Sequence, residues 1–137
     1  MNRSFVVIAG LGLAGAAILA ARSPAPPASK VDRGAYIVAH VAMCIQCHTP
    51  RDENGDLIPT RMLSGAPIPL ASPYPARPWA YRAPNIRGMI GYTDEEGLRL
   101  LMQGITRNGT PPRPPMQRFG MNREDAEAVV AYLKSLK

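Results

Sequence analysis

The pattern of apolar and polar residues along this chain predicts three amphipathic helices after residue 30. In residues 32–43, Tyr36, Ile37, His40 and Val41 recur every three to four positions. That spacing matches the period of an α-helix and places these side chains on one face. We therefore expect a first helix that leads straight into residues 44–48.

Residues 93–104 carry the start and stop signals of a second helix. Thr93 is a good N-cap, Glu96 completes a capping box and Gly104 is a typical stop. The apolar face of this helix consists of Leu98, Leu101 and Met102. A third helix is predicted to begin after Asn122, with Asp125 in its first turn and a buried stripe made of Ala126, Val129, Val130, Leu133 and Leu136.

Prolines divide the rest of the domain into long loops. Seven prolines lie between Leu57 and Asn85, which excludes a long helix or a central strand there. Residues 107–115 form a second loop rich in proline and glycine. Loops of this length in a compact domain usually have a functional reason, such as wrapping a cofactor. No segment predicts a strand, so we expect an all-α domain of three to four helices with long Pro-rich loops.

Residues 1–22 have the pattern of an export segment. A short basic start is followed by an uncharged, mostly apolar run from Phe5 to Ala21, which is near the minimum length of a membrane-spanning helix. We expect either a cleaved signal peptide or an N-terminal membrane anchor through residues 5–21. A Pro- and Ala-rich linker at residues 23–30 would join this apolar helix to a domain at residues 31–137. In both cases the domain is exported.

The most specific chemical signal is the sequence Cys-Ile-Gln-Cys-His at residues 44–48. Two cysteines three positions apart with a histidine directly after them form the attachment signal for c-type haem. Each thiol can add to one haem vinyl group, so Cys44 and Cys47 would hold the ring by two thioether bonds. His48 would then lie under the iron and bind it. We expect one covalently attached haem c, and the export segment agrees with attachment outside the cytoplasmic membrane.

Other uses of a Cys-x-x-Cys pair fit this chain less well. A structural zinc site needs four protein ligands, but the chain has no further cysteine and one further histidine, His40. A disulfide between Cys44 and Cys47 would close a very small loop and staple nothing larger. A redox-active dithiol is an alternative that the adjacent histidine disfavours.

A methionine is the expected second iron ligand if the protein transfers electrons. Met43 adjoins the attachment side of the ring, Met102 has the spacing of a core residue, and Met121 directly precedes a helix cap. Met62 and Met89 lie in loops and stay open as candidates. Met116 is the strongest candidate, because the two prolines before it restrain its backbone. His40 lies on the same side of the ring as the motif and cannot easily reach the opposite face.

Residues 31–137 resemble a single-haem, class I bacterial cytochrome c. The resemblance rests on Arg33-Gly34-Ala35-Tyr36, the CIQCH motif, APNI at residues 83–86, PPM at residues 114–116 and AYLKSL at residues 131–136. It implies that the first and last helices cross, with Gly34 allowing close approach and Tyr36 packing near Tyr132 or Leu133. It also implies His48 as the proximal and Met116 as the distal iron ligand. One difference from the family pattern is Gln117, where relatives often have proline.

The same resemblance suggests residues that would orient or contact the haem. In such proteins a proline carbonyl often accepts the free ring N–H of the ligating histidine, and Pro59 is the nearest match. Asn85 and Trp79 resemble residues that contact haem propionates, although packing and turn formation explain each of them equally well.

The acidic residues are unevenly spread along a chain of net charge +6. No Asp or Glu lies between Leu57 and Thr93, or between Gly97 and Arg123, whereas each segment holds several arginines. If both segments line the haem edge, that face would attract redox proteins with acidic docking surfaces, such as a dehydrogenase donor and an oxidase or cytochrome acceptor. A solvated surface with one or two arginines balancing the propionates explains the pattern equally well. Nucleic acid is an implausible partner for an exported haem protein.

Together these features predict an electron carrier rather than an enzyme. With a histidine and a methionine both bound, the iron would cycle between Fe(III) and Fe(II) without an open position for a substrate. The alternatives are a fixed electron-relay subunit of a membrane dehydrogenase or oxidase, and an open-site haem protein that binds small ligands or peroxide. We expect the domain on the periplasmic side of the bacterial inner membrane, either anchored or soluble.

Overall fold

The fold is described from a computed structural model, in which residues 29–136 are placed. The first helical unit, α1 at Lys30–Tyr36, continues into a π-helical turn, η1 at Ile37–Val41. The elements that follow are the helix α2 at Cys44–His48, the 3₁₀ turn η2 at Pro59–Arg61, the strands β1 at Ala66–Pro67 and β2 at Arg82–Ala83, the 3₁₀ turn η3 at Arg87–Met89, and the helices α3 at Asp94–Gln103 and α4 at Arg123–Ser135. Within the described residues the sheet is one antiparallel pair of two-residue strands. The expected all-α class is confirmed.

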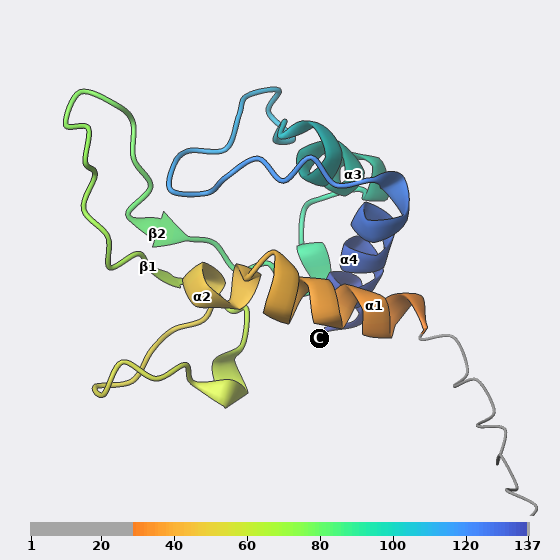
Figure 1. The fold of residues 1–137 in the computed structure, drawn as a ribbon, viewed down its shortest axis with the longest axis horizontal. Coiled ribbons are helices and arrows are strands. Elements are labelled where there is room, and N and C mark those ends of the chain that lie inside the picture. Colours follow the sequence, from red (N-terminus) through yellow and green to blue (C-terminus); the bar gives the residue numbers. More distant parts are fainter. Residues whose placement is uncertain (1–28, 137) are drawn as a thin grey trace, which may run out of the picture.

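The first and last helices cross at a glycine, as the family resemblance implied (Figure 1). A Cβ atom on Gly34 would lie 2.0 Å from the backbone oxygen of Ala128 and 2.7 Å from Cβ of Tyr132. Only a residue without a side chain therefore lets the two backbones approach this closely. The expectation for Tyr36 was wrong. Its side chain is 60% exposed, and its ring lies 5.4 Å from the ring of His40, so Gly34 takes the position beside Tyr132.

The helix boundaries follow the capping residues in the sequence. The Thr93 hydroxyl accepts from the backbone N–H of Glu96, whose carboxylate accepts from the N–H of Thr93, and Gly104 ends α3 in a left-handed conformation. The Asn122 side chain caps α4 by accepting from the N–H of Asp125. A capping box at Ser29 and Asp32 was not recognised in the sequence, and it starts α1 within the expected linker.

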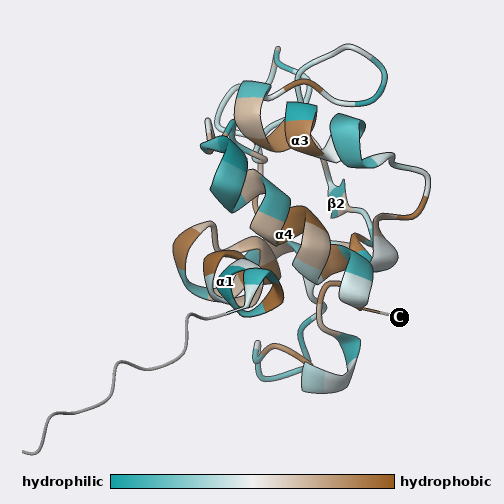
Figure 2. Ribbon diagram, turned by 90° about the vertical axis from the view of Figure 1, so that its right-hand side faces the viewer, coloured by the Kyte–Doolittle hydropathy of each residue, from teal (hydrophilic) through white to brown (hydrophobic). Residues whose placement is uncertain are grey.

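The core lies where α4 packs between α1 and α3 (Figure 2). Ala126, Val129, Val130 and Leu133 of α4 are buried, as expected, whereas Leu136 at its end is half-buried. The other buried members are Ile37, Val38, Leu63, Met89 and Leu101. The core therefore draws its side chains from η1, η3, α3 and α4, together with Leu63 from a loop.

The long segment from 57 to 85 is a loop, as predicted, apart from η2 and the two short strands. Hydrogen bonds fix its course: the N–H of Gly65 donates to the carbonyl of His48 over 2.7 Å, and the N–H of Ile86 donates to that of Leu63 over 3.0 Å. In the part of the chain that the structure describes, no helix is long and apolar enough to cross a membrane. The expected apolar helix and most of the linker lie outside the described residues.

Candidate functional site

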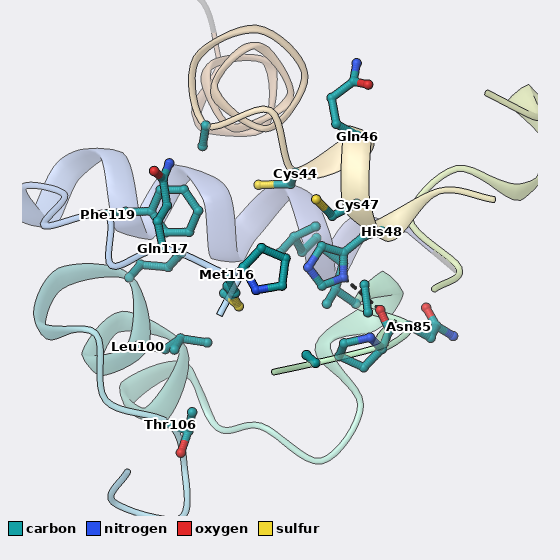
Figure 3. Close-up of a pocket in the computed structure, with 18 of the residues that line it drawn as sticks. Cys44, Gln46, Cys47, His48, Asn85, Leu100, Thr106, Met116, Gln117 and Phe119 are labelled. Carbon is teal, nitrogen blue, oxygen red and sulfur yellow. Dashed lines mark hydrogen bonds between the residues drawn. The ribbon is translucent and has the colours of Figure 1, made fainter. Parts of the chain in front are cut away.

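A cavity of about 530 Å³ opens between α2 and the loops that face it. Residues from α2, from the segment after β2, from α3 and from the loop before α4 line it together (Figure 3). Most lining side chains are apolar, among them Ile68, Ile86, Leu100, Leu101 and Phe119. An apolar hollow with a few polar groups at defined positions is the usual form of a cofactor site.

The Cys-x-x-Cys-His motif forms the whole of α2 and delivers three reactive side chains to this cavity. Met43, just before it, adopts a left-handed conformation with φ 54°, which non-glycine residues adopt at an energetic cost. This turn ends the first helical unit and starts α2 in a new direction. Figure 3 shows the sulfurs of Cys44 and Cys47 and the ring of His48 at the same cavity wall.

The environment of Cys44 argues against dithiol redox chemistry. Burial raises the pKa of Cys44 to about 11, whereas reactive redox cysteines have a lowered pKa. A metal ion bound by three or more His, Cys, Asp or Glu side chains is also unsupported, because the described residues contain no such group. Two thiols at an apolar wall fit thioether formation, since a thioether carries no charge.

The ring of His48 is held by a proline, but not by the expected one. Its Nδ1–H donates to the carbonyl of Pro84 over 2.8 Å, whereas Pro59 is an exposed residue at the start of η2. Burial lowers the pKa of His48 and so favours the neutral imidazole. Because Nδ1 carries the proton, Nε2 is left with a lone pair for a metal.

Gly65 explains how Pro84 reaches His48. A Cβ atom on Gly65 would lie 2.7 Å from the backbone nitrogen of Asn85 and 2.9 Å from the carbonyl oxygen of Ala83. The chain on both sides of Pro84 therefore passes directly over Gly65, whose own N–H is bonded to the carbonyl of His48. The APNI stretch contained this proline, but its partner lies 36 positions away in sequence and no local signal joins them.

The methionines separate into those at the cavity and those away from it. Met62, Met102 and Met121 are not among the lining residues, while Met43, Met89 and Met116 are. Met89 is buried in the core, where its sulfur would lie 3.5 Å from a Cβ on Gly97. Met62 accepts a weak hydrogen bond from the Thr49 hydroxyl. Met116 is half-buried at the cavity, in the loop that leads to α4 (Figure 3).

The remaining polar candidates divide in the same way. Asn85 lines the cavity and its side-chain oxygen accepts from the N–H of Arg87. Trp79 is not a lining residue, and its indole N–H donates to the carbonyl of Leu70 over 2.9 Å. Two arginines that were not singled out in the sequence, Arg82 and Arg113, do line the cavity. The acid-free runs pointed to arginines in general without selecting these two.

Comparison with known proteins agrees with this site. A family model described as cytochrome c matches residues 31–137. The chain belongs to the cytochrome c family. Among curated proteins, this cytochrome c is similar to the fructose dehydrogenase cytochrome subunit of Gluconobacter japonicus, at 30% identity over 117 residues. The similarity covers 77% of this chain and 22% of that subunit, so the chain spans about a fifth of the relative's length.

The residues present fit the covalently bound haem that the family implies. Two thiols, an imidazole with one free nitrogen and a thioether all line one apolar cavity. Arg82 and Arg113 add positive charge at the same cavity, which suits the two propionates of a haem. This cytochrome c therefore has the donor set and the apolar wall for haem chemistry and electron transfer.

Proposed function

We propose that this cytochrome c carries one haem c and passes single electrons between redox partners on the exported side of the bacterial inner membrane. Cys44 and Cys47 would form the thioethers, and His48 and Met116 would be the two iron ligands. Bound haem iron would supply one-electron chemistry, cycling between Fe(III) and Fe(II). The observation that carries the proposal is the meeting of the α2 motif and Met116 at one cavity.

Each of these residues has a role that its contacts support. The bond from His48 to Pro84 fixes the ring plane and the tautomer, and such bonds also raise ligand basicity. Met116 would close the opposite side, which leaves no position for a substrate and favours a carrier over an enzyme. The apolar lining from Ile86, Leu101 and Phe119 would keep water away from a bound haem.

Optical spectra of the ferric protein test this assignment. Wild type should show the Met–Fe(III) charge-transfer band, and Met116→Ala should lose it. Met62→Ala is the matched control, because Met62 lies away from the cavity, and Met89→Ala tests the buried cavity methionine. Both should keep the band. Its absence from wild type, together with ready CO binding by the reduced protein, would instead support an open-site haem protein.

A second role uses the same chemistry in a fixed complex. The relative in Gluconobacter japonicus is described as a cytochrome subunit of a dehydrogenase, and this favours a relay subunit of a membrane dehydrogenase or oxidase as the alternative. Size-exclusion chromatography of the natively produced protein distinguishes the two. Elution as a monomer supports the mobile carrier, whereas co-elution with a dehydrogenase or an oxidase supports the relay.

The apolar run at residues 5–21 supports an exported location, either anchored or soluble. Mass spectrometry of the natively produced chain tests this part of the proposal. An intact N-terminus in the membrane fraction supports an anchor, and a start near residue 22 in the soluble fraction supports a signal peptide. A haem-free chain in the cytoplasm would contradict both.

A further inference from the structure

The loop between β1 and β2 presents three large apolar side chains to solvent. Leu70 is 54% exposed, Tyr74 is 59% exposed and Tyr81 is 72% exposed. In Figure 1 this loop extends away from the crossing of α1 and α4. Clusters of exposed apolar side chains on one element mark interaction sites more often than isolated ones do.

Internal hydrogen bonds fix the shape of this loop. The N–H of Ile68 donates to the carbonyl of Tyr81 over 2.9 Å, directly beside the β1–β2 pair. Further out, the Trp79 indole donates to the carbonyl of Leu70, and the N–H of Arg77 donates to that of Tyr74 over 3.0 Å. A loop that is already ordered loses little conformational entropy when it binds a partner.

The charge around these side chains has one sign. The guanidinium of Arg77 lies 5.3 Å from the ring centre of Tyr74. A hollow of about 380 Å³ separates the loop from the turn before Met116, and it is lined by Arg77, Pro78, Arg113 and neighbouring residues of 110–114. No Asp or Glu occurs in either loop. The hollow is therefore cationic, with stiff walls of proline.

The same loop forms a wall of the haem cavity on its other side. Ile68, Ala80 and Arg82 line that cavity, while the side chain of Tyr81, between two of them, is 72% exposed. The N–H of Ala80 donates to the carbonyl of Pro114 over 2.7 Å, which joins this wall to the Met116 loop. A protein seated on Tyr81 is thus one layer of chain away from the cavity.

We propose that the docking loop, residues 68–82, binds an acidic patch on a redox protein, with Tyr81, Tyr74 and Leu70 as its apolar centre and Arg77 as its charged rim. The proposal rests on the electron-transfer function above and names the surface that this function uses. Charge selects the occupant: a second copy would bring arginine against arginine, which is unfavourable. The hollow is concave, so a protruding carboxylate side chain fits it better than a flat lipid surface would fit it.

Reduction by an acidic flavodoxin tests this surface with the haem-loaded full chain. One electron passes from the reduced flavin to the ferric haem, and stopped-flow absorbance gives the second-order rate constant. We expect Tyr81→Ser to lower this constant about tenfold, the loss typical of a central interface aromatic. Arg77→Gln should lower it about threefold at low salt, and high salt should remove this difference because the steering is electrostatic.

Matched controls change the same residue types elsewhere. Tyr36→Ser removes a tyrosine of similar exposure, 60%, from α1. Arg61→Gln makes the same change in net charge as Arg77→Gln, but in η2. Neither should slow reduction by flavodoxin. A second reductant, neutral reduced lumiflavin, needs no docking surface, so all four variants should react with it at the wild-type rate.

The two reductants separate failure of this proposal from failure of the proposed function. A haem that lumiflavin cannot reduce contradicts the electron-transfer function itself. Two results overturn the docking proposal alone, provided that lumiflavin reduces the haem normally. In the first, Tyr81→Ser and Arg77→Gln leave the rate with flavodoxin unchanged. In the second, all four variants lower that rate equally. The docking proposal is also overturned if Tyr81→Ser leaves the rate with flavodoxin at the wild-type value but abolishes either self-association in sedimentation or binding to phosphatidylserine vesicles. The loop would then bind a second copy or a lipid surface.

Discussion

The crossing of α1 and α4 and the loops around the cavity are stabilised in different ways. At the crossing, Gly34 brings two backbones into contact, and buried side chains such as Val38 and Val129 fill the surrounding space. Around the cavity, segments are joined by single hydrogen bonds, such as those from His48 to Pro84 and from Ala80 to Pro114. The helix crossing is continuously packed, so it tolerates the loss of one contact better than the cavity wall, which has few contacts. The conformation of the loops therefore depends more on what fills the cavity.

Among the changes that test this difference between the crossing and the loops, loss of the haem should have the largest effect on folding. We expect the Cys44→Ala/Cys47→Ala variant of the full chain to lose attached haem and most of its helical circular dichroism. A domain of about this size buries only about two thirds of its surface and has little stability in reserve, and here the apolar cavity walls would face water. Gln46→Ala, which leaves the motif intact, is the control. Native helicity in the double variant would show that the helices fold without attached haem.

The helix crossing should be the next most sensitive point. Gly34→Ala places a Cβ atom 2.0 Å from the oxygen of Ala128, so the helices must separate, and we expect a loss of about 3 kcal/mol in the free energy of unfolding by urea. Gly97→Ala is the matched control in α3, because its Cβ meets the end of the flexible Met89 side chain at 2.8 Å. Equal losses in both variants would contradict a special role for the crossing.

Gly65 tests the loop side of the comparison. Gly65→Ala would press against the backbone of Asn85 and displace Pro84 from His48, and we expect a loss of about 2 kcal/mol with a changed NMR shift of the His48 Nδ1–H. Gly55→Ala separates close approach from backbone strain. Its φ of 87° nearly equals the 86° of Gly65, but nothing lies within 4 Å of its Cβ. An unchanged Nδ1–H signal in Gly65→Ala would refute this account of the histidine.

The smallest effect is expected at the surface of the crossing. The Lys30 ammonium donates to Glu127 over 2.9 Å, and this hydrogen bond lowers the pKa of the exposed Glu127 carboxyl. A lowered pKa stabilises the fold above the unfolded-state value, and the gain is lost as the pH falls through the folded value. Glu127→Gln should therefore unfold at a slightly lower urea concentration than wild type at about pH 7, and at the same urea concentration at about pH 3. A difference that grows in acid would reverse this sign.

The sequence by itself determined the elements whose signals are local. Thr93, Glu96 and Gly104 bound α3, and Asn122 starts α4, because a cap acts within one helical turn. The Cys-x-x-Cys-His motif also acts within one turn, so the family and its covalent cofactor could be predicted from residues 44–48. Ser29 was missed as a cap although its signal is equally local, because the Pro-rich composition before it suggested a linker.

Tertiary structure decided what lies opposite the motif. Pro84 instead of Pro59 reaches His48 because Gly65 lets two distant segments touch, and Tyr36 turns to solvent because Gly34 takes its place beside Tyr132. Tertiary packing also determines that Arg82 and Arg113 are the arginines that line the cavity. It likewise determines which side of the 68–82 loop faces solvent. Such contacts join residues tens of positions apart, and a loop without periodicity carries no pattern that reveals its neighbours.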